Sequence, residues 1–207
     1  MDREEAIYLA DYRRRVHEMY AQVRARSDPK AGWHEWRNDR DRLFKDHPSS
    51  AIDPVQREAF TGLHYFEYDP AYRFDVKLIP ISPTPVAIAH SGEGRTSFVP
   101  IGTVSLDNIG VDETLVIYWL EAYGGGLFLP FRDATAAEST YGGGRYLLDT
   151  VKGADLGGTS PRLLLDFNYA YHPSCVYSTR WSCPLAPEGN GLSAEIRAGE
   201  RLTPRPG

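Results

Sequence analysis

The stretch between residues 131 and 190 carries the side chains best suited to chemistry. One polar run leads into three consecutive glycines and an arginine, and a second polar run follows the apolar residues 163–165. Side chains of Asp, Glu and His are the usual general acids and bases of enzymes. The candidates for proton transfer in this stretch are Asp133, Glu138, Asp166 and His172. The candidates for ligand binding are Arg145, Tyr141, Asn168 and Tyr171.

Arg145 directly follows the glycines at residues 142–144, and two interpretations of this spacing are open. Glycine allows a close approach to the backbone, and a guanidinium forms paired hydrogen bonds with a carboxylate or a phosphate. We therefore expect Arg145 to face a pocket and bind the anionic part of a small ligand. The alternative is a glycine-rich hairpin or bulge in which Arg145 pairs with Asp133 or Asp166. A Walker-type phosphate loop is excluded, because a strand pattern follows the glycines and no Lys-Ser or Lys-Thr pair is present.

Asp166 and Asn168 stand two residues apart at the end of an apolar segment. An extended chain would direct both side chains the same way. Together with His172 they could supply a base, an orienting amide and an acid. The alternative is an Asx turn that ends the strand and satisfies backbone groups of the loop.

Cys175 and Cys183 are the only two cysteines, and three interpretations of them are open. They could form a loop disulfide, provide half of a metal site with His172, or remain as buried thiols. Zinc-binding cysteine pairs usually have two to four residues between them, and this chain has no second pair. We therefore expect no metal, with buried thiols in a reducing cytoplasm as the first interpretation and a disulfide as the second.

The composition is that of a folded globular protein. The chain has 207 residues, of which 42% are hydrophobic and 25% are charged. No apolar run approaches the roughly 18 residues of a membrane-spanning helix, so we expect no membrane partner and a cytoplasmic location. A net charge of -5 disfavours nucleic acid as a partner. We expect a small-molecule ligand and no cofactor, and we leave open whether the chain forms a homo-oligomer.

The first 60 residues show helical periodicity and contain a single glycine, Gly32. Apolar residues recur at steps of three and four between residues 9 and 23, which predicts an amphipathic helix of about six turns. The Asp-Pro pair at residues 28–29 predicts the start of a second helix, because Asp caps helices and Pro suits their first position. Trp33 and Trp36 belong to its apolar stripe.

A second Asp-Pro pair, at residues 53–54, predicts a short third helix with Gln56 placed for a capping box. From Tyr65 onward the apolar period changes to two, which predicts strands. The strands that we expect cover residues 73–78, 86–90, 96–101, 114–122, 127–131, 145–148, 162–167 and, as a short last strand, 195–197.

These patterns predict an α+β fold in which an N-terminal helical hairpin packs on an antiparallel β-barrel or sandwich. No helical pattern of ten residues follows residue 62, which disfavours parallel βαβ units. We expect the helices of residues 1–60 to belong to the same domain as the antiparallel β-structure of residues 61–200. Residues 201–207 are expected to form a tail.

Three motifs carry a family resemblance. They are Thr-Tyr-Gly-Gly-Gly-Arg-Tyr at residues 140–146, Asp-Phe-Asn-Tyr-Ala-Tyr-His-Pro-Ser-Cys at 166–175, and Cys-Pro-Leu-Ala-Pro-Glu-Gly-Asn at 183–190. With them, the sequence resembles an uncharacterised prokaryotic family, the domain of unknown function 1684. The resemblance implies a shared site around these motifs, and it implies no reaction.

Two functions of different classes follow from these residues. The first is an enzyme that acts by acid–base chemistry on a small polar or anionic metabolite, with the reaction unknown. The second is a noncatalytic β-barrel that binds a small ligand with the same arginine and tyrosines. A redox or metal module built on the two cysteines and a flavin-binding barrel are further alternatives.

Overall fold

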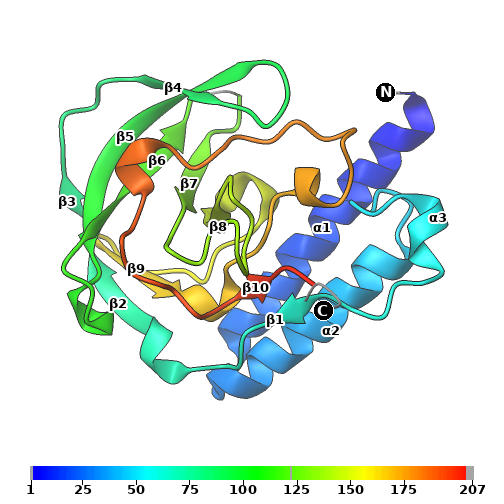
Figure 1. Ribbon diagram of the computed structural model, residues 1–207, viewed down its shortest axis with the longest axis horizontal. Coiled ribbons are helices and arrows are strands. Elements are labelled where there is room, and N and C mark those ends of the chain that lie inside the picture. The colour runs from blue at the N-terminus through cyan, green and yellow to red at the C-terminus, as the bar shows by residue number, and fades with distance from the viewer. Residues whose placement is uncertain (1, 122, 204–207) are drawn as a thin grey trace.

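The computed structural model describes residues 2–121 and 123–203. Its N-terminal part consists of α1 (Arg3–Ala25), α2 (Pro29–Asp46) and the single turn α3 (Pro54–Arg57). Figure 1 shows α1 and α2 side by side as a hairpin along one side of the β-structure. Ala122, at the end of a predicted strand, and residues 204–207 of the predicted tail lie outside the described residues.

Local caps explain where the two long helices begin. The carboxylate of Asp2 accepts the backbone N–H of Glu5, whose side chain in turn accepts the N–H of Asp2, which is a capping box. At the second helix, Asp28 accepts the N–H groups of Lys30 and Ala31, as its Asp-Pro pair predicts.

The predicted capping box of the third helix is not formed. Asp53 makes no side-chain bond to that helix. Its carboxylate instead accepts the hydroxyl of Ser178 at 3.0 Å. A tertiary partner thus replaces the local one, and α3 ends after four residues.

Antiparallel strands make up the rest of the fold. The strands are β1 (His64–Tyr65), β2 (Arg73–Lys77), β3 (Ile79–Pro80), β4 (Val86–Ala89), β5 (Arg95–Ser105), β6 (Thr114–Leu120), β7 (Gly126–Phe131), β8 (Arg145–Asp149), β9 (Arg162–Asp166) and β10 (Glu200–Arg201). Short 3-10 helices connect them: η1 (Pro70–Tyr72), η2 (Asp107–Ile109), η3 (Thr150–Lys152), η4 (Phe167–Tyr169), η5 (Ser174–Val176) and η6 (Glu188–Asn190).

The strands pair in three sheets within the described residues. One sheet has six strands, in the order β3-β5-β6-β7-β8 with β4 also paired to β5, and the two-stranded sheets are β1-β10 and β2-β9. Every pair is antiparallel. The predicted class is therefore confirmed as α+β, with N-terminal helices and antiparallel sheets.

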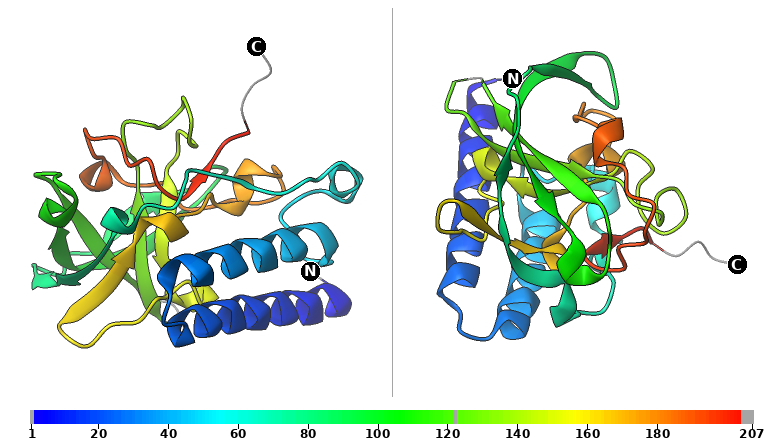
Figure 2. Two further views of the ribbon diagram at one scale, coloured as in Figure 1. Left: turned by 90° about the horizontal axis from the view of Figure 1, so that it is seen from below. Right: turned by 90° about the vertical axis from the view of Figure 1, so that its left-hand side faces the viewer.

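The described residues form three apolar cores, of which the third gathers Phe98, Phe128 and Tyr146 of the six-stranded sheet. The first joins β2 and β9 to the six-stranded sheet through residues such as Val76, Leu165 and Leu129. The second holds the hairpin in place, with Trp36 packed against Tyr65 of β1 and Tyr169 of η4. Both views in Figure 2 show the hairpin against the β-structure. No helix of the described residues is long and apolar enough to cross a membrane.

The predicted short strand at residues 195–197 is wrong, and side chains explain why. The carboxylate of Asp133 accepts the N–H of Ile196 at 2.6 Å, and Arg145 donates to the Ile196 carbonyl at 2.8 Å. These bonds take the backbone groups that a neighbouring strand would need. The last strand instead forms at Glu200, where β10 pairs with β1.

Candidate functional site

The predicted site residues do not converge on one cavity. His172 and Tyr171 line a cavity between the helical hairpin and the β-structure, whereas the other candidates do not line it. Asp133 and Arg145 form one buried cluster, and Asp166 and Asn168 form another. Glu138 is exposed in the loop before β8.

Arg145 is surrounded by hydrogen-bond acceptors of the protein itself. Its Nη2 atom donates to Asp133 Oδ2 at 3.3 Å, and Nη1 donates to the carbonyls of Ala198 and Glu200. Only its Nε–H lacks a partner among the described residues. This geometry agrees with the interpretation in which Arg145 pairs with Asp133 and has a structural role. The guanidinium holds the C-terminal segment through the carbonyl groups of that segment.

The glycines before Arg145 serve close approach within the chain itself. A Cβ atom on Gly143 would lie 2.4 Å from the Tyr141 ring, and one on Gly144 would lie 2.6 Å from the carbonyl oxygen of Phe131. Gly144 also has φ +97°, a backbone conformation that favours glycine. The triple glycine therefore lets this turn pack tightly between β7 and the segment at Ala186.

Asp166 and Asn168 form an Asx turn, which is the second of the two interpretations of the sequence. Asp166 Oδ1 accepts the backbone N–H of Asn168 at 3.0 Å and caps η4, and Arg73 lies 3.2 Å from its other oxygen. Burial raises the pKa of Asp166, against these hydrogen bonds. The side chain of Asn168 bonds both backbone groups of Asp69. The two side chains thus tie β9 to the loop before β2.

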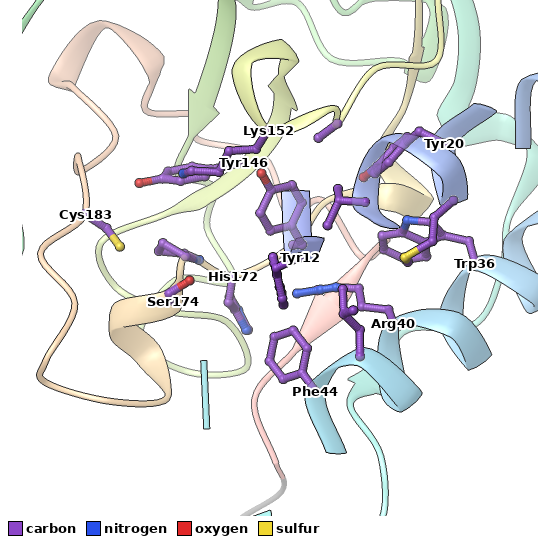
Figure 3. Close-up of a pocket in the computed structure, with 16 residues that line it drawn as sticks. Tyr12, Tyr20, Trp36, Arg40, Phe44, Tyr146, Lys152, His172, Ser174 and Cys183 are labelled. Atoms are coloured by element: carbon purple, nitrogen blue, oxygen red, sulfur yellow. The ribbon is translucent and has the colours of Figure 1, made fainter. Parts of the chain in front are cut away.

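The cavity of about 80 Å³ is the place where side chains of the helices face those of the sheet. Figure 3 shows its residues. Its aromatic walls are Tyr12, Tyr20, Trp36, Phe44, Tyr146 and Tyr171. Its polar residues are Arg40, Lys152, His172, Ser174 and Cys183. The combination of aromatic walls with a few polar groups is typical of small-molecule sites.

Arg40 is the central charge of the cavity. Its Nη2 atom donates to Glu200 Oε2 at 2.7 Å, and its guanidinium lies over the rings of Phe44 and Tyr171. Burial alone would lower the pKa of Arg40, but Glu200 and the neighbouring tyrosines together outweigh it and raise the pKa. Conversely, burial alone would raise the pKa of Glu200, and Arg40 with His172 brings it below its usual value. Both groups are therefore charged at neutral pH.

Glu200 also contacts His172 and orients its ring. The backbone N–H of His172 donates to Glu200 Oε2 at 3.0 Å, and the Nδ1 atom lies 3.5 Å from Oε1. The Nε2 atom accepts the backbone N–H of Tyr141 at 3.2 Å. The ring of His172 therefore lies between the Tyr141 backbone and Glu200, with its Nδ1 atom directed at the carboxylate.

Two buried donors at the cavity have no partner among the described residues. They are the hydroxyl of Tyr20 and the indole N–H of Trp36, in side chains that are 3% and 1% exposed. The two groups lie near each other, and the Trp36 N–H opposes the rise that burial causes in the pKa of Tyr20. Figure 3 shows Tyr20, Trp36 and Arg40 gathered on the helical side of the cavity. Buried polar groups without partners are rare in native proteins and costly. These two therefore mark a place where an acceptor on a ligand would be favourable.

Lys152 supplies a second cation at the opposite wall. Its ammonium lies 2.9 Å from Asp149 Oδ2, and the hydroxyl of Tyr171 is 3.5 Å from the same oxygen. The attraction of Asp149 is the main reason why the pKa of Lys152 is raised. Each cation of the cavity is thus balanced by one carboxylate.

Both cysteines are free, and Cys183 lines the cavity. Among residues 2–121 and 123–203, no group of three or more His, Cys, Asp and Glu side chains could hold a metal ion. The Cys183 thiol is the main cause that lowers the pKa of Cys175 to about 6, against the opposing effect of burial.

The sequence interpretation missed Arg40, Glu200 and Lys152. Arg40 sits in the polar run of residues 37–42, which resembles a solvated helix face. A usable signal was its position, four residues after Trp36 and four before Phe44, on the apolar stripe of the helix. A single charge on such a stripe must find a buried partner.

Comparisons with known proteins agree with the fold and leave the reaction open. The solution NMR structure of an uncharacterized protein from Haloarcula marismortui is 33% identical, covering 84% of this chain and 94% of that chain, with a TM-score of 0.59. No curated protein matches the chain. The family described as "Protein of unknown function (DUF1684)" matches residues 58–201. Because the match spans all three motifs and every strand from β1 to β10, the chain belongs to the DUF1684 family.

Proposed function

We propose that this protein binds a small polar or anionic ligand with an apolar part, in the cavity between the helical hairpin and the β-structure. The observation that carries the proposal is that Tyr20 and Trp36, neighbours of each other at the cavity beside Arg40, have no other partner among the described residues. A carboxylate or another acceptor between them would receive the hydrogen bonds that these groups lack. The aromatic walls would cover the apolar part of the ligand.

The size and charge of the cavity support a small ligand. Its volume of about 80 Å³ exceeds several-fold the ~15 Å³ that a single water needs. Because Glu200 balances Arg40 and Asp149 balances Lys152, the cavity carries no large net charge. A ligand with one acceptor group and a compact apolar body suits it better than a multiply charged phosphate.

Binding without turnover is the function that the geometry supports best. Of the four acid–base candidates, His172 alone lines the cavity, and both its ring nitrogens already face protein groups. Catalysis by Asp133, Glu138 or Asp166 stays a prediction, as do a barrel or sandwich arrangement of the sheets and a cytoplasmic location. The packing of β2 and β9 on the core of the larger sheet supports the sandwich.

The experiment uses a series of small carboxylates, acetate, butyrate and benzoate, with neutral benzamide, monitored by ligand-observed NMR and by thermal melting. We expect benzoate or butyrate to bind and to raise the melting temperature. Tyr20→Phe removes only the unpartnered hydroxyl, so it should leave the stability of the free protein within about 0.5 kcal/mol. Binding should weaken about five-fold or more, because a hydrogen bond to a charged group is lost.

Tyr65→Phe is the matched control. Tyr65 also has a buried hydroxyl without a partner among the described residues, yet it does not line the cavity. This variant should bind the carboxylates as the wild type does. Equal affinity of the Tyr20→Phe variant and the wild type, or no binding by any of the probes, would reject the proposed site.

A further inference from the structure

The polar side chains that line the cavity gather at two places. Tyr20, Trp36 and Arg40 form the first place, on the helical hairpin, where the proposed acidic group of the ligand would bind. Tyr171 and Lys152 form the second place, on the β-structure. Figure 3 shows Lys152 on the other side of the cavity from Trp36. The proposed function assigns a ligand group only to the first place.

Tyr171 has a hydroxyl that makes only a long contact within the protein. It lies 3.5 Å from Asp149 Oδ2, whereas a typical O–H···O bond is roughly 2.7–2.8 Å long. Burial raises the pKa of Tyr171 well above its usual value, so the hydroxyl keeps its proton and remains a donor. The neighbouring Tyr146 differs, because its hydroxyl donates to the Pro184 carbonyl. Of these two wall tyrosines, Tyr171 is the one that has a donor to offer a ligand.

Lys152 adds a charged donor at the mouth of the cavity. Its side chain is 51% exposed, so this end of the cavity opens to solvent. Its ammonium lies 2.9 Å from Asp149 Oδ2, and an ammonium carries three donors. The second place therefore combines donors on Lys152 and Tyr171 with the carboxylate of Asp149, which is an acceptor.

A hydroxyl group on the ligand fits this second place better than another carboxylate does. A hydroxyl can accept from Lys152 or Tyr171 and donate its own proton to Asp149. A carboxylate can only accept, and its charge would meet that of Asp149, whose side chain is only 8% exposed. Like charges repel each other more strongly where water is excluded. An apolar group would leave the Tyr171 hydroxyl without a good partner.

The Tyr171 side chain also indicates how far apart the two places are. The guanidinium of Arg40 lies over its ring, 5.1 Å from the ring centre, whereas the hydroxyl of the same ring is next to Asp149. The two places are thus separated by about the size of a phenol group. A ligand that reaches both needs polar groups at opposite ends of a body of this size.

We propose that the cavity binds a hydroxycarboxylic acid, with its carboxylate beside Arg40 and its hydroxyl between Tyr171 and Lys152. This inference rests on the proposed function and adds the chemistry of the second end of the ligand. A para-hydroxylated aromatic acid or a short ω-hydroxy acid has its two polar groups at opposite ends, as the cavity requires.

The test measures affinities at pH 7 by NMR titration for two matched pairs of acids, benzoate with 4-hydroxybenzoate and butyrate with 4-hydroxybutyrate. The pair whose unhydroxylated member binds more tightly gives the readout. Its hydroxylated member should bind about ten-fold more tightly, because it gains hydrogen bonds to charged groups. The matching dicarboxylate, terephthalate or succinate, should bind less tightly than the hydroxy acid. A dicarboxylate that binds as tightly as the hydroxy acid would overturn the proposal.

Two variants locate the hydroxyl of the ligand. Tyr171→Phe keeps the ring over Arg40 and removes its hydroxyl, and Lys152→Met removes the ammonium. In each, the advantage of the hydroxy acid should shrink to about two-fold or less. The ratio of the two affinities is the readout, because a general disturbance of the cavity weakens both acids together. Tyr65→Phe, whose hydroxyl lies outside the cavity, should keep the wild-type ratio.

The outcomes distinguish this inference from the proposed function on which it rests. Binding of benzoate or butyrate with no advantage from the hydroxyl would overturn the inference and leave the carboxylate site intact, a result that needs no variant. An advantage that persists in both Tyr171→Phe and Lys152→Met would also overturn it, because the hydroxyl would then bind elsewhere. If none of the acids binds, the inference and the proposed function are both wrong.

Discussion

Arg40 and Arg145 are both buried, and each is paired with one buried carboxylate, yet they lie in opposite surroundings. Arg145 donates to three carbonyl groups besides Asp133. Among the described residues, Arg40 donates only to Glu200, and it lies over aromatic rings and faces a cavity. A buried arginine whose donors are taken up by carbonyls builds the fold, whereas one with donors to spare can receive a ligand. The number of hydrogen-bond acceptors around each guanidinium distinguishes the two roles, whereas the residue type does not.

The largest effect is expected at Arg145. In the Arg145→Met variant, Asp133 keeps a buried charge without its partner and three carbonyls lose a donor. The free energy of unfolding should fall by about 3–5 kcal/mol, measured by urea denaturation. The double variant Arg145→Met with Asp133→Asn should recover part of this loss. A loss under about 1 kcal/mol would show that this cluster is not the structural counterpart of the Arg40 site.

The glycine turn offers the next test of that structural role. Gly144→Ala places a Cβ 2.6 Å from the Phe131 carbonyl at a positive φ, so we expect a loss of about 2–4 kcal/mol. Gly142→Ala is the matched control, because its nearest neighbour would be an ordinary 3.6 Å away. It should change stability by about 0.5 kcal/mol or less. Similar melting temperatures of the two variants would contradict the assignment of the glycines to packing.

A smaller effect concerns the pH dependence of stability. Two buried carboxylates should contribute to this dependence with opposite signs. The pKa of Glu200 is lowered in the folded protein, so its contribution is present above about pH 4.5, the ordinary pKa, and is lost as the pH falls through its folded pKa. The pKa of Asp166 is raised, so its contribution is present below the ordinary pKa and is lost as the pH rises through its folded pKa.

Urea denaturation between pH 3 and 7 would measure these contributions. As the pH is lowered, the free energy of unfolding should fall less in the Glu200→Gln variant than in the wild type. In the Asp166→Asn variant it should fall more than in the wild type. The same direction of change in both variants would mean that Glu200 is not held in its charged form by Arg40.

Much of the fold could be predicted from local sequence, and most of the candidate site could not. Apolar periodicity and the Asp-Pro pair at residues 28–29 predicted the two long helices, because caps and stripes are local features. Strand alternation similarly predicted β2 and β4 to β9 within a few residues. The Arg40–Glu200 pair spans 160 residues, and no local pattern indicates that the two meet. The polar motifs drew attention to Arg145 and Asn168, whose hydrogen bonds are satisfied within the protein.

The cavity has one further consequence, because its walls come from two parts of the chain, the helical hairpin and the β-structure. Tyr20, Trp36 and Arg40 belong to the hairpin, whereas Tyr146 and His172 belong to the β-structure. A bound ligand would bridge the two and oppose their separation by RT ln(1 + [L]/Kd), about 2.7 kcal/mol at a hundred-fold excess over Kd. Amide hydrogens of α1 and α2 would then exchange more slowly with solvent in proportion to ligand occupancy.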